Sequence, residues 1–434
     1  MYNTLVLPDR TQLPTGKIAN QPPQKRKTAH GAGFPDTSRP SVRFGNVGGA
    51  NGSAAADGGG RQPQERPGRP WTLSVAVAAS WLEVAKSEVQ ALSSVGRLAR
   101  ALAVFCVDEV VVFDDFPGRA SAAAGDGPLP LVATGDEDAS PFSSSSKTSL
   151  ETDPGLFASH VLSYLECPPF MRKALFPLHP NLRQSGLLPS LDMPHHPNPQ
   201  DGALPYREGV VVDPSDDAHV PPARKRLVSS GHATTVDVGA GPGQAVTLRS
   251  VSIPPRTRVT LHFPRDDDPS HAEAVDPAEP RAQAGLYWGY AVRRAGSLSA
   301  AITESPFVDD GGYDVTVGTS ERGDSVTGLV RDWRRTEDAE EKQRGRREKD
   351  GTDGSGAGSR RFKHLLVVFG GRRGLEYAAE NDAELSRMGI RGARTRELFD
   401  HWVDVLPNQG SRTIRTDEAL FIALTALRPL WDDS

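Results

Sequence analysis

Residues 399–427 read FDHWVDVLPNQGSRTIRTDEALFIALTAL, and this stretch decides how the chain folds. Its first part predicts a short apolar strand over residues 403–406, followed by a loop of turn-forming and hydrogen-bonding residues, 407–411. A basic segment, residues 412–415, precedes a predicted helix that begins near Thr416, a residue able to cap it. Most of the circumference of this helix is apolar, which predicts that it is buried in the domain interior or at a subunit interface.

Two stretches upstream predict neighbouring strands that end in similar loops. Residues 313–323 read YDVTVGTSERG, and residues 364–376 read HLLVVFGGRRGLE. The continuous apolar run 365–369 is typical of a strand covered on both faces. The glycines that follow it either form a plain turn or let a ligand approach the backbone closely. Because open α/β sheets bind ligands at the carboxyl ends of their strands, the three loops together predict a ligand cradle.

The rest of the chain alternates between ordered and low-complexity segments. Strands predicted over residues 72–78 and 104–113, with helical periodicity between them, begin a parallel α/β sheet. A second helical pattern covers residues 156–175 and breaks at two prolines. Short alternating strands at 209–213, 234–239, 244–249 and 258–263 predict a small β-barrel, after which residues 285–293 return the chain to the main sheet. We expect residues 1–70 to form a disordered tail and residues 117–150 a surface insertion. Residues 323–361 are expected to loop out into solvent.

Composition and charge exclude several classes of protein. The 434 residues carry a formal net charge of −5, so any nucleic-acid site must be a local basic patch. Only two cysteines occur, both in apolar surroundings, which fits buried thiols in a reducing compartment. The chain has no apolar run of membrane-spanning length, and its N-terminus lacks the apolar core of a signal peptide. We therefore expect an intracellular, soluble protein. The basic run 24–27 is either a nuclear localisation signal or a solvated cluster.

Taken in order, the motifs GTSERG, FGG and LPNQGSRTIRT resemble the three C-terminal motifs of the SPOUT, or α/β-knot, RNA methyltransferases. The match is closest to a eukaryotic and archaeal subgroup with an inserted OB-like domain, whose animal members are also described at spindles and kinetochores. Further matching blocks span most of the chain after residue 71: RALAVFCVDEVVVFD (100–114), YLECPPFMRKALFP (164–177), SGLLPSLDMPHH (185–196), YREGVVVD (206–213) and AGLYWGYAVRRA (284–295).

The resemblance implies a fold and a cofactor. The fold would be α/β, with a trefoil-knot methyltransferase domain formed by residues 71–205 and 285–434. An OB-like barrel would occupy residues 206–284, and residues 1–70 would form a tail. The cofactor would be S-adenosylmethionine, and the implied contacts are Thr319, Gly370, Gly371, Leu406, Asn408, Ser411 and Ile414.

Four residues are candidates for the chemistry. Methyl transfer to an imide nitrogen requires that a proton leave, which a base or an anion-stabilising arginine would assist. The resemblance places basic residues of the family at Arg322 and Arg100, and Glu304 and Glu321 are candidate bases. For each arginine the alternative is an ordinary salt bridge or a phosphate contact, and for the two glutamates a plain structural role is favoured.

RNA contacts are predicted at arginine clusters beside the strand-end loops, namely Arg372, Arg373, Arg412 and Arg415, with residues 224–226 on the insert as a further basic run. A solvated charged face is the alternative. The pair His195–His196 has no Cys or His partner at ligand spacing, so we predict no metal site.

The sequence thus predicts an S-adenosylmethionine-dependent RNA methyltransferase. The resemblance further implies a homodimer and a target at uridine N3 of large-subunit ribosomal RNA, which would favour the nucleus or nucleolus. The alternative is a non-catalytic RNA-binding or spindle-associated scaffold that retains the knot. Unbroken cofactor loops favour the enzyme.

Overall fold

The computed structural model describes residues 68–116, 148–197, 204–212, 233–239, 245–249, 251–264, 271–349 and 362–432. Residues 1–67 of the predicted N-terminal tail, most of the insertion at 117–150 and the basic run 224–226 lie outside these ranges.

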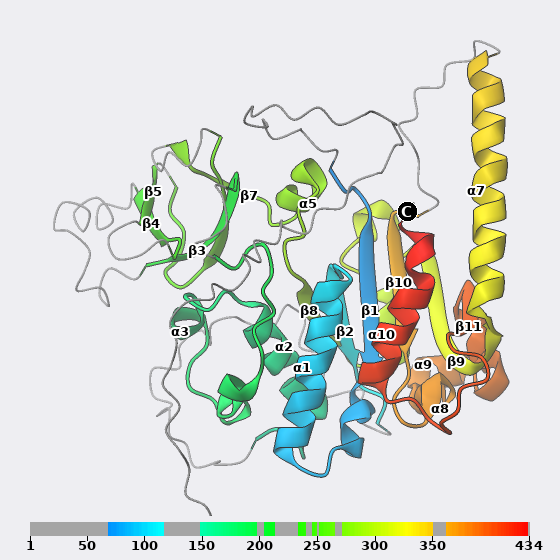
Figure 1. The fold of residues 1–434 in the computed structure, drawn as a ribbon. Coiled ribbons are helices and arrows are strands. Elements are labelled where there is room, and N and C mark those ends of the chain that lie inside the picture. The colour runs from blue at the N-terminus through cyan, green and yellow to red at the C-terminus, as the bar shows by residue number, and fades with distance from the viewer. Residues whose placement is uncertain are drawn as a thin grey trace, which may run out of the picture. The chain divides into compact units, whose positions relative to one another are not determined.

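The described residues form a six-stranded parallel sheet in the order β11-β9-β10-β1-β2-β8 (Figure 1). Its strands are β1 (Thr72–Ala78), β2 (Glu109–Phe113), β8 (Ala291–Ala295), β9 (Val315–Ser325), β10 (His364–Phe369) and β11 (His401–Asp404). Thus β9 and β10, predicted from two separate motifs, are adjacent, and β11 pairs with β9 at the edge. The parallel α/β sheet predicted from the sequence is confirmed.

Helices cover both faces of this sheet. The α-helices of the described residues, not all of which contact this sheet, are α1 (Glu88–Val104), α2 (Pro154–Glu166), α3 (Arg172–Leu175), α5 (Glu279–Ala284), α6 (Leu298–Thr303), α7 (Val326–Lys349), α8 (Gly374–Asn381), α9 (Ala383–Arg387) and α10 (Thr416–Leu427). Short 3-10 helices are η1 (Ala79–Val84), η2 (Pro180–Leu182), η3 (Ser185–Leu187), η5 (Val308–Asp310), η6 (Gly392–Leu398) and η7 (Arg428–Leu430).

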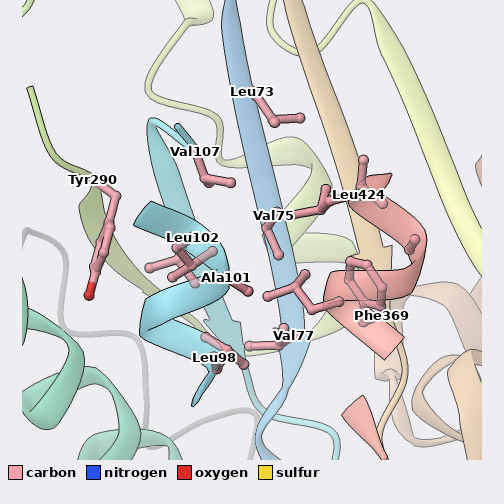
Figure 2. Packing of buried hydrophobic residues seen from close by; sticks show 14 of the residues in the cluster. Leu73, Val75, Val77, Leu98, Ala101, Leu102, Val107, Tyr290, Phe369 and Leu424 are labelled. Carbon is pink, nitrogen blue, oxygen red and sulfur yellow. The ribbon is translucent and has the colours of Figure 1, made fainter. Parts of the chain in front are cut away.

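The core lies in two layers because successive strand side chains point to opposite faces. On β1, Leu73, Val75 and Val77 pack with α1 and α10, as Figure 2 shows with Leu98 and Leu424. Ala76 and Ala78, with Val111, Phe113, Leu366 and Val368 of the neighbouring strands, face the opposite layer, which includes α6 and α8. All seven residues of β1 and all six of β10 are buried, which explains why both strands could be predicted from their mostly apolar sequences.

Helix α10 confirms the prediction of a buried C-terminal helix. Leu420, Leu424 and Leu427 are fully buried, and the helix packs against α1 and α7. Phe421 and Ile422 on its other side are only half-buried, and the Phe421 ring meets Phe105 edge-on at 6.2 Å. One side of α10 therefore belongs to the core and the other stays partly open.

The second sheet is antiparallel, with the order β5-β4-β3-β6-β7. It contains β3 (Tyr206–Val211), β4 (Ala233–Asp237), β5 (Val246–Arg249), β6 (Arg258–His262) and β7 (Glu273–Val275). A separate apolar cluster that includes Val236, Leu248 and Leu261 holds this sheet together. The predicted short strands are therefore confirmed as strands.

Several predictions about local structure were wrong. The strand predicted over residues 403–406 lies two residues earlier, as β11 (His401–Asp404). The segment after residue 323, expected to loop out into solvent, continues as β9 and then forms α7, whose Val326 and Trp333 are buried in the core. The strand predicted over residues 104–113 begins only at Glu109, because α1 runs to Val104 and the chain then turns through Cys106 at φ 54°. The apolar run at 104–113 does not by itself distinguish a helix end from a strand start.

Candidate functional site

A cavity of about 660 Å³ opens at the carboxyl ends of β1, β9, β10 and β11. Its lining comes from η1, the first half of α1, β9, the turn between β10 and α8, and the segment between β11 and α10. The lining residues are Trp81, Leu82, Val84, Ala85, Gln90, Ser94, Arg97, Thr319, Ser320, Glu321, Arg322, Phe369, Gly370, Gly371, Arg372, Arg373, Gly374, Glu376, Asp404, Val405, Gln409, Arg412, Thr413, Ile414, Arg415, Thr416, Asp417 and Ala419. The cradle predicted from the strand-end loops therefore exists as one continuous hollow.

The turn between β10 and α8 is rich in glycine because neighbouring protein atoms lie too close to leave room for side chains. A Cβ added to Gly371 would lie 1.9 Å from the Ser80 Oγ, and one added to Gly370 would lie 2.6 Å from the Gly374 backbone. Gly374 itself has φ +80°, a left-handed conformation that other residues rarely adopt. These glycines thus allow the turn to pack tightly on η1 and on the first turn of α8.

Ser80 and Asp115 form a buried pair directly behind this turn. The Ser80 N–H donates to the Asp115 carboxylate at 3.0 Å, and the Ser80 hydroxyl donates to its other oxygen. Burial raises the pKa of the Asp115 carboxyl above its ordinary value, although the two hydrogen bonds from Ser80 act in the opposite direction. The pair fixes η1 to the end of β2 and so supports the wall of the cavity formed by Gly371.

Strand β9 forms a second wall and is longer than the sequence indicates. The loop expected at residues 318–320 is extended strand as far as Ser325, paired with β11 through a register shift at Trp402. A Cβ on Gly318 would lie 2.6 Å from the Trp402 ring, so this glycine too serves packing. The Thr319 hydroxyl donates to the Val368 carbonyl oxygen at 2.9 Å, which joins β9 to β10 at the cavity floor.

The segment from β11 to α10 closes the cavity. Asn408 has φ 62°, and the Ser411 hydroxyl donates to the Thr413 carbonyl oxygen at 2.8 Å, so the loop is held by local turns. The Thr416 hydroxyl donates to the Gly370 carbonyl oxygen at 3.3 Å and ties α10 to the glycine turn. The helix cap is Arg415 rather than Thr416, and its N–H donates to the Glu418 carboxylate at 3.1 Å.

Charged side chains surround the mouth of this cavity. Arg372, Arg412 and Arg415 are exposed and form no ion pair with any carboxylate of the described residues. Arg373 stacks on the Tyr377 ring with its guanidinium carbon 4.5 Å from the ring centre. The chain has a net negative charge, so this group of cations is the local basic patch that an anionic ligand or RNA would require.

Residues 72–427 match the family model described as "Putative RNA methyltransferase". The chain belongs to this family. It is 37% identical over 370 residues to a human protein named 28S rRNA (uridine-N(3))-methyltransferase, covering 84% of this chain and 80% of the human one. Proteins of the same name from Drosophila melanogaster and mouse are 39% and 36% identical. These alignments cover 85% and 83% of this chain, and 64% and 77% of the respective relatives.

The structure of this RNA methyltransferase brings most of the predicted site residues together. Thr319, Gly370, Gly371 and Ile414 line the cavity, as do Glu321, Arg322 and all four arginines predicted to bind RNA. Leu406, Asn408 and Ser411 lie in the closing segment, between lining residues but not among them. Arg322 donates to the Glu376 carboxylate at 3.3 Å, which places its guanidinium at the start of α8.

Two predicted residues lie elsewhere. Arg100 does not line the cavity, and its guanidinium donates to the Leu191 carbonyl oxygen at 2.6 Å. Glu304 is exposed at the end of α6 and does not line the cavity either. The hydrogen bond of Arg100 joins α1 to the segment at Leu191.

Sequence reasoning missed the wall that α1 contributes. Gln90, Ser94 and Arg97 line the cavity, and the Arg97 Nε donates at 2.6 Å to the buried carboxylate of Asp417 in α10. This pair joins residues 320 positions apart in sequence. The only local signal was that α1 follows a buried strand, which predicts a helix N-terminus at a carboxyl strand end.

His195 and His196 belong to a buried ionic network. The Nε2 atoms of both imidazoles lie within hydrogen-bonding distance of the Glu166 carbonyl oxygen, at 3.1 and 2.7 Å. Arg258 of β6 donates to Glu166 at 2.6 Å and to Glu208 at 2.6 Å. Burial alone would raise the pKa of Glu166, yet Arg258 and His195 hold it well below its usual range. Among the described residues no group of three side chains is arranged to hold a metal ion.

None of the described helices combines the length and the apolar character that a bilayer crossing needs.

Proposed function

We propose that this methyltransferase transfers a methyl group from S-adenosylmethionine to uridine N3 in large-subunit ribosomal RNA. The observation that carries the proposal is the cavity where β9, β10 and β11 end, with exposed arginines at its mouth. The target base is taken from the printed name of the human, fly and mouse relatives.

The residues at the cavity fit such a cofactor. Its volume lies within the range of about 300–1,000 Å³ for small-molecule sites. Trp81, Leu82, Phe369 and Ile414 offer apolar walls, and the glycine turn offers backbone groups without side chains in the way. When bound, S-adenosylmethionine supplies an electrophilic methyl group on a sulfonium. We assign Thr319, Gly370, Gly371 and Ile414 to the cofactor, with Leu406, Asn408 and Ser411 shaping the closing segment.

A residue of this chain must accept the proton that leaves the acceptor nitrogen. Glu321 and Arg322 line the cavity on β9, so the first is the candidate base and the second the candidate for stabilising the uridine anion. Arg322 forms an ion pair with Glu376. Because its side chain is largely exposed, it can also turn toward RNA. We assign no step of the reaction to Arg100 or Glu304.

RNA would be held at the cavity mouth. Arg372, Arg373, Arg412 and Arg415 lie on the two segments that frame it, and their charges suit the phosphate backbone. Binding of this kind is strongly weakened by salt.

The finer architecture is also proposed. A trefoil knot is supported by the chain crossing back from edge strand β11 to α10, which packs on α1 beyond β9 and β10. We retain residues 71–205 and 285–434 as the knot domain and residues 206–284 as an OB-like insert, supported by the separate antiparallel sheet.

A homodimer is supported by apolar side chains on α1 and α10 that remain open to solvent. Val89 and Val104 of α1 are exposed, and Phe421 and Ile422 of α10 are half-buried. A ribosomal RNA target would place the protein in the nucleus or nucleolus. The basic run 24–27 lies outside the described residues.

The test is isothermal titration of the protein with S-adenosylmethionine and S-adenosylhomocysteine. Wild type should bind both, and Ile414→Arg should abolish binding because it places a charge in the apolar part of the cavity. Val308→Arg, at an exposed position of η5, is the matched control and should bind like wild type. If the folded wild-type protein bound neither ligand, the proposed methyl transfer would be overturned, and the non-catalytic RNA-binding scaffold would be favoured.

A further inference from the structure

The segment that follows α2 has an unusual charge. Residues 167–191, hereafter the basic segment, contain Arg172, Lys173 and Arg183 and no aspartate or glutamate. The whole chain, by contrast, has more acidic than basic residues, 55 against 50. Without a carboxylate of its own, this stretch carries a net positive charge in an otherwise acidic protein.

Aromatic rings gather where this segment packs on α2. The His160 ring stacks on Phe176 with 6.0 Å between ring centres and meets His179 edge-on at 4.7 Å. Tyr164, one turn further along α2, meets Phe176 at 5.5 Å. Four rings from α2 and the basic segment therefore form one cluster, hereafter the ring cluster.

The two imidazoles of the ring cluster are uncharged at neutral pH. Burial, and then the neighbouring His179, lower the pKa of His160 to about 4. Partial desolvation lowers the pKa of His179 as well, although much of its side chain remains exposed. Both rings therefore present neutral π faces to their surroundings, as a phenylalanine would.

Apolar and basic side chains on the same surface remain open to water. Leu178, between Phe176 and His179, is 93% exposed, and His179 itself is exposed. Lys173 is exposed and forms no ion pair with a carboxylate of the described residues. Arg172 instead stacks on Tyr164 at 4.6 Å and donates to two carbonyl oxygens at the end of α2, so it fixes the segment in place.

The basic segment is connected to the cavity through α1, which lies between α2 and α10 in Figure 1. Leu188 packs on α1 at Gly96, where an added Cβ would lie 2.8 Å from the Leu188 Cδ2. Arg97, the next residue of α1, lines the cavity. A ligand that extends from the cavity along α1 would therefore meet the basic segment.

We propose that the ring cluster, with Leu178 and Lys173, is a second RNA-binding surface that takes unpaired nucleotides flanking the target. The chemistry favours RNA over a protein ligand because flat neutral rings stack on bases while neighbouring cations contact phosphates. The surface rests on the proposed function only in that it assumes an RNA substrate.

The first test measures binding of a fluorescein-labelled oligouridylate by fluorescence anisotropy. The double variant Lys173→Glu/His179→Ala should bind it at least about 10-fold more weakly than wild type, since one stacked base and one phosphate contact are lost. The double variant Lys363→Glu/Met388→Ala, at exposed positions outside both the cavity and the basic segment, is the matched control and should bind like wild type. Titration with S-adenosylmethionine should be unchanged in both.

The second test locates the RNA directly. Ultraviolet cross-linking to an oligouridylate containing 4-thiouridine, followed by mass spectrometry, should identify peptides that contain residues 174–183. Leu178→Ala changes only a side chain at the surface, so this single variant serves if the double variant misfolds, and it should reduce that cross-link.

The outcomes separate this surface from the catalytic proposal. If wild type binds RNA and cross-links at residues 174–183 but fails to bind S-adenosylmethionine, the surface stands and the methyltransferase reaction falls. If the Lys173→Glu/His179→Ala variant binds RNA like wild type, the surface is overturned even though methyl transfer proceeds. A variant that loses only self-association would assign the surface to a second copy of the chain and also overturn the proposal.

Discussion

Gly371→Ala tests the packing behind the cofactor turn. The added Cβ would lie 1.9 Å from the Ser80 Oγ and 3.2 Å from the Asp115 carboxylate, well inside ordinary contact distance. Either the glycine turn or η1 must move, and overpacking of this kind costs about 1–3 kcal/mol of unfolding free energy. Because Gly371 lines the cavity, the same movement should weaken binding of S-adenosylmethionine.

The cause can be isolated with a double-mutant cycle measured by urea unfolding and isothermal titration. Ser80→Gly removes the clashing hydroxyl but also the hydrogen bond to Asp115, which should cost about 1–3 kcal/mol on its own. The double variant Gly371→Ala/Ser80→Gly should lose less stability than the two single variants added together. Strict additivity would show that the two residues do not compete for the same space.

Gly186→Ala is the matched control, since nothing lies within 4 Å of a Cβ at that position. It should change stability by less than about 0.5 kcal/mol. If Gly371→Ala proved as stable as Gly186→Ala and bound the cofactor like wild type, the proposed role of the turn would be refuted.

Three further predictions concern the ionic network and the cavity mouth. Arg258→Met should cost about 3–5 kcal/mol in chemical unfolding, since it leaves the buried carboxylate of Glu166 without its cation, and a stability equal to wild type would argue against the network. Burial lowers the pKa of His196 to about 3, so the unfolded chain binds a proton more readily. The contribution of His196 to the free energy of unfolding is therefore fully present above the ordinary histidine pKa. It decreases as the pH is lowered, by about 2 kcal/mol between about pH 7 and about pH 5. Unfolding curves of wild type and His196→Gln should converge in this range, whereas a constant gap would contradict the assignment. Arg412→Ala/Arg415→Ala should weaken RNA binding and reduce the slope of log affinity against log salt by about one per lost phosphate contact, and an unchanged slope would remove these arginines from the RNA site.

Buried strands and the C-terminal helix could be predicted from the sequence. The runs in β1 and β10 are apolar at almost every position because helices cover both faces, and α10 is apolar because it packs on α1 and α7. The boundaries of β9 and α7 could not be predicted, since Gly318 and the charged residues after it are usual signs of a loop. In the structure the ring of Trp402 fills the space beside Gly318, and Trp333 anchors α7 to the core.

The composition of the cavity shows the same limit. The strand-end loops were predicted because each has its own local signal of small, turn-forming residues. Arg97 has no such signal, because its place at the cavity depends on a buried carboxylate 320 positions away. Gly370 and Gly371 line the cavity, but the sequence could not show that Ser80 fills the space beside Gly371.

The central claim is methyl transfer to uridine N3, and nucleoside analysis tests it most directly. Purified protein would be incubated with S-adenosylmethionine and unmodified large-subunit ribosomal RNA, and the digested RNA analysed by liquid chromatography and mass spectrometry. The account predicts 3-methyluridine that requires the cofactor, appears with wild type and Val308→Arg, and is absent with Ile414→Arg. Cofactor binding without any methylated nucleoside, or a methyl group on another atom, would contradict it.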